Sequence, residues 1–466
     1  MKVLPFVKKQ VLDDMGGSEQ AIYIVKYLGT LDAKTVLIEY DYVNKDYLID
    51  YANYYCRSFS KHERYVTRLH FFSENFFPDE IKNEGNPRKN EQQLREYFLN
   101  IFHKEEFKKN LDSYLGYTVI KPIFDEDSNN FIGKTLLKPL NENKNGYEYL
   151  THDYEASLFG IPLKIKSLPY QAQDKIVSMC ATTALWISTQ ALNSVFETHV
   201  DLSPYEITET SLSVPSENRN FPTSGGLSTY QMKTYFNKIG FETELINVDE
   251  GHGVIGGVYE LLQTTVKAYL RYGIPVIACL CLERATLGNP EYHAVVITGY
   301  KCDSEGNIIE LYVHDDQVGP YSTSSPTHKR ISESGPYNLV NWENDWTKNK
   351  GFSQVRVIRL MVPLYPKIRY PFSKIYEEYM ETKTEFKTKG YNTDLFITDV
   401  NTYKKQLVEF NISEKGNVLV TKLPRFLWVI RVTKEGDLIP SFDSVFDATS
   451  SIRPTEDKPK VIDYMH

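Results

Sequence analysis

The sequence predicts a mixed α+β protein built from two or three domains. The chain has 466 residues, more than one hydrophobic core usually spans. Hydrophobic residues make up 41% of it and charged residues 24%, which is an ordinary balance for a globular protein. In its middle segment, helix-like runs come first and strand-like runs follow, an order typical of α+β domains rather than of alternating α/β domains.

The first segment mixes both kinds of element. Strand-like runs occupy residues 35–43 and 115–124, and a helix-like run occupies residues 90–102. Polar, turn-rich stretches at 78–91 and 140–149 connect them. Because the second stretch marks a change of pattern, we expect an N-terminal α+β domain of unknown role over residues 1–150.

The middle segment, residues 151–365, begins with a predicted helix that carries Cys180. Ser178 is its expected N-cap, and small and apolar residues continue the helix to about Leu192. A long loop rich in Ser, Pro, Asn and Gly is expected over residues 201–226. A capping box of Ser228 and Gln231 then predicts another helix, for which Gly240 is the expected left-handed stop.

The second half of the middle segment is predicted to form an antiparallel sheet. After a helix over residues 257–271, strand-like runs lie at 274–282, 293–302, 307–315 and 354–363. The remaining residues, 366–466, are expected to form a small C-terminal α+β module. This module combines an amphipathic helix at 373–390 with short strands at 407–412, 417–423 and 426–439.

Composition excludes several classes of function. The net charge of −8 argues against nucleic-acid binding, which needs clustered Lys and Arg to replace phosphate counterions. The longest apolar run, residues 274–282, is too short to cross a bilayer, and the N-terminus lacks the pattern of a secretion signal. Five cysteines without CxxC spacing do not suggest a disulfide framework. We therefore expect a cytoplasmic protein that binds no membrane; its oligomeric state is left open.

Cys180 is the first candidate for chemistry. A thiol is a weak nucleophile until it ionises, and the unpaired backbone N–H groups at a helix start favour the thiolate. Gln173 lies seven residues earlier, where its side-chain amide and the Cys180 N–H are suited to bind an oxyanion together. Taken alone, this pattern favours an ordinary buried cysteine, because free cysteines are among the most buried residues.

The second candidate lies in a predicted hairpin over residues 291–317. A turn centred near Ser304 places His293 opposite Asp315, within one residue, and cross-strand Cβ atoms are about 4.5–5.5 Å apart. Both residues end an otherwise apolar stripe, so each is the nearest partner for the other. His314 and Asp316 have the opposite parity and are expected to face solvent, although a shift of one residue puts Asp316 in the place of Asp315.

Together these residues form an ordered set. A catalytic thiol needs a base, and the base needs a group that fixes its tautomer. Gln173, Cys180, His293 and Asp315 occur in this order, each in a suitable element. The order and the chemistry reverse the interpretation of Cys180, which we now expect to be a nucleophile.

The middle segment resembles papain-fold cysteine peptidases, in particular the bacterial branch whose members process double-glycine leader peptides. Six stretches follow the pattern of that family in order: "LPYQAQ", "CATTALW", "GGLSTYQMKTYFNKIGF", "YLRYGIPVIACL", "YHAVVITGY" and "LYVHDDQVGPY". The resemblance implies that Cys180 is the nucleophile, His293 the base and Asp315 the orienting carboxylate. It also implies an oxyanion donor at Gln173, with Gln171 as the less favoured substitute.

The sequence departs from this family at two places. Met179 stands where a Gly often precedes the cysteine, and "DDQVG" stands where Asp-Pro often follows the third strand. The second departure leaves Asp315 and Asp316 as alternatives.

The resemblance implies a hydrolase that cleaves a peptide or isopeptide bond in a peptide or protein substrate and needs no cofactor. Two alternatives stay open: a transglutaminase-like acyltransferase, and a non-catalytic binding or scaffold protein with a relic triad. A zinc site built from Cys180, His293 and Asp315 is not favoured, because no tightly spaced second ligand pair is present. We therefore expect no metal.

Overall fold

The computed structural model describes most of the chain as two compact units. The described residues are 1–77, 91–102, 104, 111–141, 144–214, 226–248, 255–285, 289–330, 338–412, 414–450 and 459–464. The first unit contains Met1–Tyr235, Glu291–Ser325 and Glu343–Phe352, and the second contains Phe236–Pro290, Pro326–Trp342 and Ser353–His466. Both units combine helices with antiparallel strands, as expected for an α+β protein. The division into segments 1–150, 151–365 and 366–466 stays a prediction.

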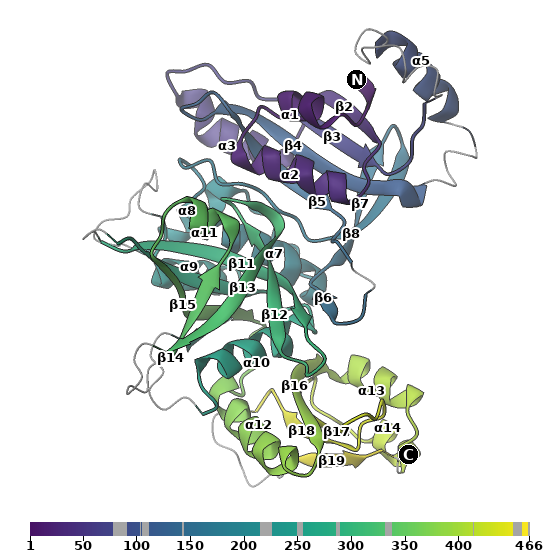
Figure 1. Ribbon diagram of the computed structural model, residues 1–466, viewed down its shortest axis with the longest axis vertical. Helices are drawn as coiled ribbons and strands as arrows, with labels where there is room; N and C mark the ends of the chain where they lie inside the picture. The colour runs from purple at the N-terminus through teal and green to yellow at the C-terminus, as the bar shows by residue number, and fades with distance from the viewer. Residues whose placement is uncertain are drawn as a thin grey trace. The chain divides into compact units, whose positions relative to one another are not determined.

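The first unit opens with a five-stranded antiparallel sheet whose strands follow one another in sequence order. These strands are β1 (Lys2–Pro5), β2 (Thr35–Tyr42), β3 (Val66–Phe72), β4 (Tyr114–Phe124) and β5 (Asn130–Leu137). The helices of this region are α1 (Lys8–Asp14), α2 (Glu19–Thr30), α3 (Lys45–Asn53) and α5 (Glu91–Phe102), of which α1 and α2 lie against one face of the sheet (Figure 1). The strands predicted at 35–43 and 115–124 and the helix predicted at 90–102 are thus confirmed.

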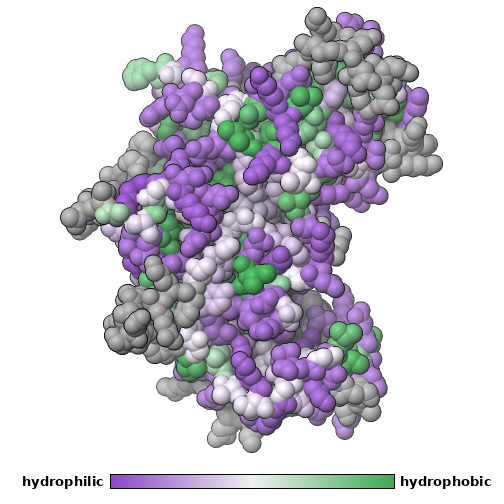
Figure 2. Space-filling view, in the orientation of Figure 1, coloured by the Kyte–Doolittle hydropathy of each residue, from purple (hydrophilic) through white to green (hydrophobic). Residues whose placement is uncertain are grey.

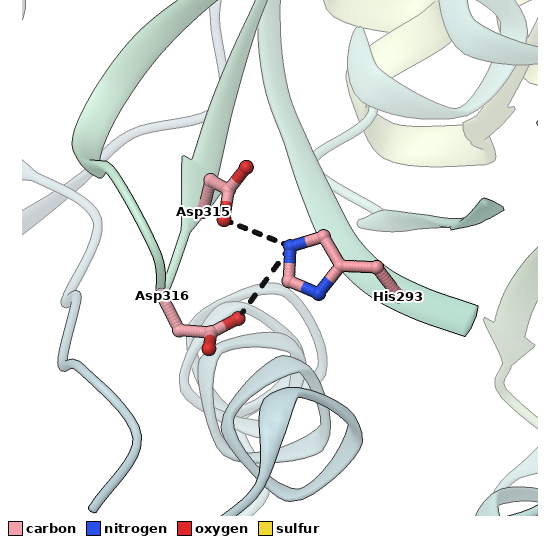
Figure 3. Close-up of side chains that lie close together, drawn as sticks. All are labelled: His293, Asp315 and Asp316. Atoms are coloured by element: carbon pink, nitrogen blue, oxygen red, sulfur yellow. Dashed lines mark hydrogen bonds and ion pairs between the residues drawn. The ribbon is translucent and has the colours of Figure 1, made fainter. Parts of the chain in front are cut away.

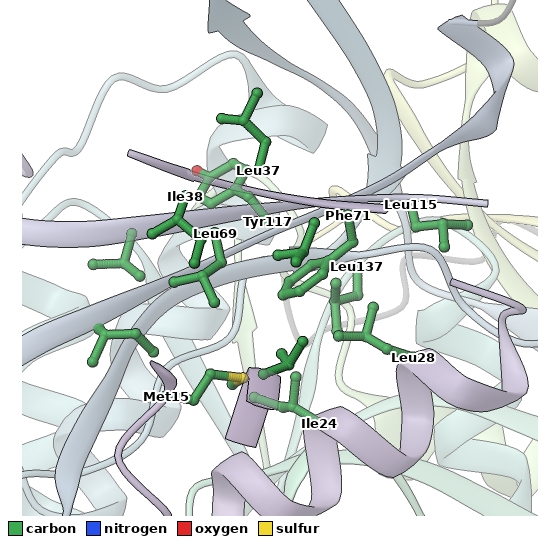
Figure 4. Packing of buried hydrophobic residues seen from close by; sticks show 14 of the residues in the cluster. Met15, Ile24, Leu28, Leu37, Ile38, Leu69, Phe71, Leu115, Tyr117 and Leu137 are labelled. Carbon is green, nitrogen blue, oxygen red and sulfur yellow. The ribbon is translucent and has the colours of Figure 1, made fainter. Parts of the chain in front are cut away.

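The core of this region extends beyond residue 150. Figure 4 shows Met15, Ile24 and Leu28 pointing from the helical layer towards sheet residues that include Leu69 and Phe71. The same buried cluster continues through β7 (His152–Leu158), β8 (Ile161–Ser167) and the segment after them, and it also contains Tyr321. The N-terminal sheet therefore shares a hydrophobic core with residues that lie after the predicted boundary.

Helix α7 (Cys180–Phe196) begins at Cys180 and packs against β11 (Glu291–Cys302). Its N-cap is Met179, not Ser178 as predicted, and Met179 provides no side-chain cap. Ser178 is instead fully buried, and its hydroxyl hydrogen-bonds the Thr183 hydroxyl at 2.9 Å. The helix continues past Leu192 to Phe196, and its last four residues are partly buried or exposed.

Two further helices belong to this part of the chain. The loop expected over residues 201–226 contains α8 (Pro204–Ser211), which starts with a capping box of Ser203 and Glu206 that the sequence analysis overlooked. Residues 215–225 of that loop lie outside the described chain. The predicted capping box of Ser228 and Gln231 is confirmed at the start of α9 (Thr229–Lys238), and Gly240 has the expected left-handed φ of +88°.

In the first unit, β11 pairs with β6 (Tyr147–Tyr149) and β12 (Ile308–Asp315), and β12 pairs with β13 (Gly319–Arg330). The β11–β12 hairpin has the predicted strands but a different register. Val296 pairs with His314 and Tyr300 with Leu311, two and three residues beyond the expected partners. The turn is centred on Glu305, one residue later than expected, and the register shifts again between Lys301 and Cys302. The Asp303 carboxylate stabilises this turn by accepting the N–H groups of Glu305 and Asn307.

The second unit contains the other strands predicted for the middle segment. β15 (Gln354–Leu364) pairs antiparallel with β10 (Val276–Glu283), β9 (Glu242–Asn247) and β14 (Asn338–Glu343). The predicted helix at 257–271 is confirmed as α10 (Val258–Leu270). The strands predicted at 274–282 and 354–363 are confirmed as β10 and β15.

The C-terminal part of the second unit is a four-stranded sheet in sequence order. Its strands are β16 (Tyr391–Asp399), β17 (Phe426–Lys434), β18 (Phe442–Asp447) and β19 (Lys460–Asp463), and the predicted amphipathic helix α12 (Phe372–Lys387) packs on β16 and β17. The strands predicted at 407–412 and 417–423 are wrong. Those residues contribute to α13 (Val400–Glu409) and α14 (Lys415–Val420), because Tyr403 and Leu407 share one buried helix face and Asp399 caps α13.

One face of the molecule offers little apolar area. Figure 2 shows a face covered mainly by hydrophilic residues, with hydrophobic ones in small separate groups. Among the described helices, none has the length and apolar character needed to span a bilayer.

We predict that the N-terminal core is sensitive to loss of Phe71, which is fully buried on β3. Phe71→Ala should lower the free energy of unfolding by about 3–5 kcal/mol, because it removes a buried ring and leaves a cavity. Phe124→Ala is the matched control, since that ring at the end of β4 is 60% exposed and should cost only about 0.5 kcal/mol. Urea denaturation of both variants measures the difference; equal losses would contradict the assigned core.

Candidate active site

Cys180 lies where a structured loop meets a helix. It is the first residue of α7 and is partly buried. The loop before it is shaped by Asp174, whose Oδ1 accepts the N–H groups of Ile176, Val177 and Ser178 at 3.0, 2.8 and 2.8 Å. A carboxylate thus organises the backbone that leads to Cys180, and the first amides of α7 lie next to the thiol.

His293 contacts two carboxylates at the end of β12. Its Nε2 lies 2.9 Å from Oδ1 of Asp315 and 3.9 Å from Oδ1 of Asp316 (Figure 3). The other ring nitrogen points away from both carboxylates. Cys180 is a further neighbour of His293 and contributes to raising its pKa. The structure therefore brings Cys180, His293 and Asp315 together from α7, β11 and β12.

The charge of His293 is set by these neighbours. Burial alone lowers the pKa of His293, but the charge and hydrogen bond of Asp315 raise it, with further contributions from Cys180 and Asp316. The balance holds the pKa of His293 well above its ordinary value. The neighbouring carboxylates therefore favour the imidazolium form of His293.

Asp315 is held by the turn that follows β12. Its Oδ1 accepts the Gln317 N–H at 2.9 Å in addition to the contact with His293, and its backbone carbonyl accepts the Val318 N–H at 3.0 Å. Its Oδ2 is buried without a hydrogen-bond partner among the described residues. The carboxylate orientation therefore depends on the position of the turn.

His314 and Asp316 are buried, contrary to the expectation that they face solvent. Burial and the neighbouring charge of Asp315 raise the pKa of Asp316 to about 7. Burial lowers the pKa of His314 to about 4, and this neutral ring donates from Nε2 to the Leu168 carbonyl at 3.0 Å and accepts the Tyr321 N–H at Nδ1. Both faces at the end of β12 are covered in this fold, so alternation along the strand does not separate buried from exposed residues there.

The two candidate glutamines lie on the segment between β8 and α7. Gln173 is 8% exposed and its Oε1 is buried without a partner, whereas Gln171 is 1% exposed and its Nε2 is buried without one. Neither amide hydrogen-bonds another residue in the described part of the chain. Each amide therefore has unused hydrogen-bonding capacity near the start of α7.

One aromatic residue at the site was missed. Trp346, in α11 (Asp345–Asn349), has its ring 5.5 Å from the ring of His293 at an interplanar angle of 36°. Its loop is fixed by a capping box of Asn344 and Thr347. The ring shields the imidazole–carboxylate contact from water and offers its π face to a cation. The run "NWENDW", with a capping residue before Trp346, was the available signal.

The buried group also has the spacing of a cation site. Ligand atoms of His293, Asp315 and Asp316 lie within 4.8 Å of one another. A metal-binding imidazole must be neutral, however, and the neighbours of His293 raise its pKa and favour its protonated form. The arrangement fits proton transfer between sulfur and nitrogen better than it fits metal binding.

We predict that Asp315 contributes more than Asp316 to the charge of His293. Asp315→Asn should lower the pKa of His293 strongly, because it removes the charge 2.9 Å from Nε2. Asp316→Asn, the matched control at 3.9 Å, should lower it less. NMR titration of the imidazole, assigned with a His293→Gln variant, measures both shifts. A larger shift in Asp316→Asn would make Asp316 the principal partner.

Comparison with known proteins agrees with the motifs in the sequence. Residues 165–353 match the model of the Peptidase_C39 like family, and this range contains Gln173, Cys180, His293 and Asp315. No curated protein matches the chain. The middle segment therefore resembles papain-fold cysteine peptidases of the C39-like family, and residues 1–164 and 354–466 lie outside the match.

Proposed function

We propose that this protein is a cysteine peptidase-type hydrolase that cleaves a peptide or isopeptide bond. Cys180 acts as the nucleophile, His293 as the base, Asp315 as the orienting carboxylate and Gln173 as an oxyanion donor. The observation that carries the proposal is the position of His293, which hydrogen-bonds Asp315 through Nε2 and has Cys180 among the neighbours that raise its pKa.

The first half of the reaction transfers the acyl group to sulfur. His293 holds the proton of Cys180, and the thiolate attacks the carbonyl carbon of the scissile bond. The carbonyl oxygen becomes an oxyanion, which the Cys180 N–H and the Gln173 amide stabilise. When the intermediate collapses, the C–N bond breaks and His293 gives its proton to the leaving amine.

The second half returns the enzyme to its starting state. His293, now neutral, takes a proton from a water molecule, and the resulting hydroxide attacks the thioester carbonyl. The C–S bond breaks, the acid product leaves, and the proton on His293 pairs again with the thiolate. Asp315 fixes the imidazole so that the same nitrogen faces sulfur in both halves.

The charge of the site favours this assignment. A pKa of His293 raised by Asp315 keeps the imidazolium available as proton donor to the leaving amine. Trp346 beside the imidazole limits the access of water to the contact between His293 and Asp315, which preserves its strength. The substrate is a peptide or protein, and nucleic acids and membranes are not expected partners, because the chain has a net charge of −8 and no long apolar helix in its described part.

We predict that Cys180 reacts fastest of the five cysteines with a peptide-based thiol electrophile at neutral pH. Exposure alone favours Cys56, which is exposed, over Cys180, which is partly buried. Peptide mass mapping after brief labelling measures the rates, and His293→Ala should slow labelling of Cys180 by about 100-fold or more without changing Cys56. If the labelling rates instead rank the cysteines by their solvent exposure, the result would support a non-catalytic protein with a relic triad.

The same preparation separates hydrolysis from transfer. Release of new amino termini from a peptide pool, lost in Cys180→Ala, supports the hydrolase. Incorporation of an added amine into the acyl product in place of hydrolysis would instead support the transglutaminase-like alternative.

We predict that Gln173→Ala lowers kcat by about 10²–10³-fold with little change in KM, because an oxyanion donor acts mainly in the transition state. Gln171→Ala is the matched control, since it removes the same amide two residues earlier. Steady-state hydrolysis of one peptide by both variants decides between them. If Gln171→Ala causes the larger loss, the donor role passes to Gln171.

A further inference from the structure

Gln20, in the first turn of α2, contacts the turn that carries the carboxylates. Its Nε2 donates to the backbone carbonyls of Asp316 at 3.0 Å and of Gln317 at 3.3 Å. One amide therefore holds two successive peptide groups next to Asp315. The Gln317 N–H in turn donates to Asp315 Oδ1, the atom that faces His293.

The same turn is fitted closely against Tyr23. A Cβ atom added to Gly319 would lie 2.2 Å from Cδ1 of Tyr23, so only glycine allows this approach. The Tyr23 ring stacks on Tyr27, with ring centres 6.1 Å apart, and Tyr27 stacks on Tyr321 at 6.3 Å. The Tyr321 N–H donates to His314, the neighbour of Asp315 in β12. A column of aromatic rings thus supports the end of β12.

A third contact joins α2 to the segment that carries Trp346. Glu19 forms an ion pair with Lys350 at 3.1 Å, just after α11. Because both side chains are exposed, this pair contributes little stability. The first turn of α2 thus lies next to both segments that lie beside His293, which are the turn after β12 and the loop with Trp346.

We propose that the first turn of α2, which lies outside the family match, is part of the hydrolytic machinery, with Gln20 and Tyr23 as positioning residues for Asp315. This proposal rests on the proposed function. Gln20 fixes the turn by its two hydrogen bonds, and Tyr23 fixes it by contact with Gly319. Residues 1–150 then complete the active site by setting the geometry of the carboxylate, on which the charge of His293 depends.

The physical basis is the dependence of Asp315 on backbone position. Its Oδ1 contacts both His293 and the Gln317 amide, so a shift of the turn changes both distances together. A misplacement of about 1 Å in a reacting group can cost on the order of 100-fold in rate. The two carbonyls that Gln20 holds accept part-buried hydrogen bonds, and losing their donor leaves the turn to find other partners.

The test uses the full chain with Gln20→Met, which keeps the length of the side chain and removes both donors. We expect kcat to fall about 10-fold or more with little change in KM, because the substrate does not touch Gln20. Gln93→Met is the matched control, an exposed glutamine on α5 in the same segment, and it should leave kcat unchanged.

A pH profile separates positioning from general destabilisation. The titratable groups that face His293 are Cys180 on α7 and Asp315 and Asp316 at the end of β12. Tyr23 and Tyr170 face these carboxylates and stay neutral, because burial, followed by the neighbouring carboxylate charges, raises the pKa of each. In Gln20→Met the weakened Asp315 contact should lower the pKa of His293, so the alkaline limb of kcat/KM should move to lower pH.

A second variant approaches the contact from the other side. Gly319→Ala forces a methyl group against Tyr23 and should reproduce the loss of kcat and the shifted alkaline limb. Adding Tyr23→Ala makes room and should restore part of both. If circular dichroism shows that Gln20→Met does not fold, Gly319→Ala with and without Tyr23→Ala tests the inference instead.

The outcomes separate this inference from the proposed function. NMR titration of His293 needs no turnover, so a lowered pKa of His293 in Gln20→Met supports the positioning role even if no peptide is cleaved. If the wild-type protein neither hydrolyses peptides nor shows selective labelling of Cys180, the proposed function is contradicted but the positioning role of Gln20 is not. The inference is overturned if the wild type is active and if Gln20→Met and Gly319→Ala both match Gln93→Met in kcat, pH profile and pKa of His293.

Discussion

The contact between His293 Nε2 and Asp315 Oδ1 is the interaction on which the rest of the site depends. Both side chains are almost fully buried, and a buried charge is tolerated only where a partner and further hydrogen bonds compensate for lost solvation. The surrounding structure supplies them: the Gln317 amide donates to Asp315, Cys180 contributes to the raised pKa of His293, and the Trp346 ring lies 5.5 Å from the imidazole. Removing any one of these leaves the remaining charges less well compensated.

This requirement explains why the site draws on distant segments. Asp315 ends a strand, so its position depends on a turn that the sheet alone does not fix. Gln20 and Tyr23 hold that turn from α2, almost 300 residues earlier in the chain. The hydrophobic cluster that includes Tyr321 anchors the same strands to the N-terminal sheet. Core packing and site geometry are therefore parts of one arrangement in the first unit.

The hairpin shows how a prediction from sequence reached a correct contact through an incorrect register. We expected the strands to pair around Ser304, whereas the turn is centred on Glu305 and a register shift follows it, so that the partners are displaced by two to three residues. A displacement of two residues, seen at Val296 and His314, leaves every side chain on the same face of the sheet. His293 and Asp315 therefore still share a face, and they meet beyond the paired part of the hairpin, where their side chains bridge the offset.

The sequence by itself determined the elements that local chemistry controls. Alternating apolar residues predicted β11 and β12, a capping box predicted α9, and the order of Cys180, His293 and Asp315 indicated their shared chemistry. Only the tertiary structure decided which faces are covered. His314 and Asp316 are buried because both faces of β12 are packed, and residues 407–412 and 417–423 contribute to helices because Leu407 and Val418 join a buried cluster. Burial and the contact of Gln20 with the Asp316 carbonyl depend on chain segments far apart in sequence, and local patterns carry no record of such neighbours.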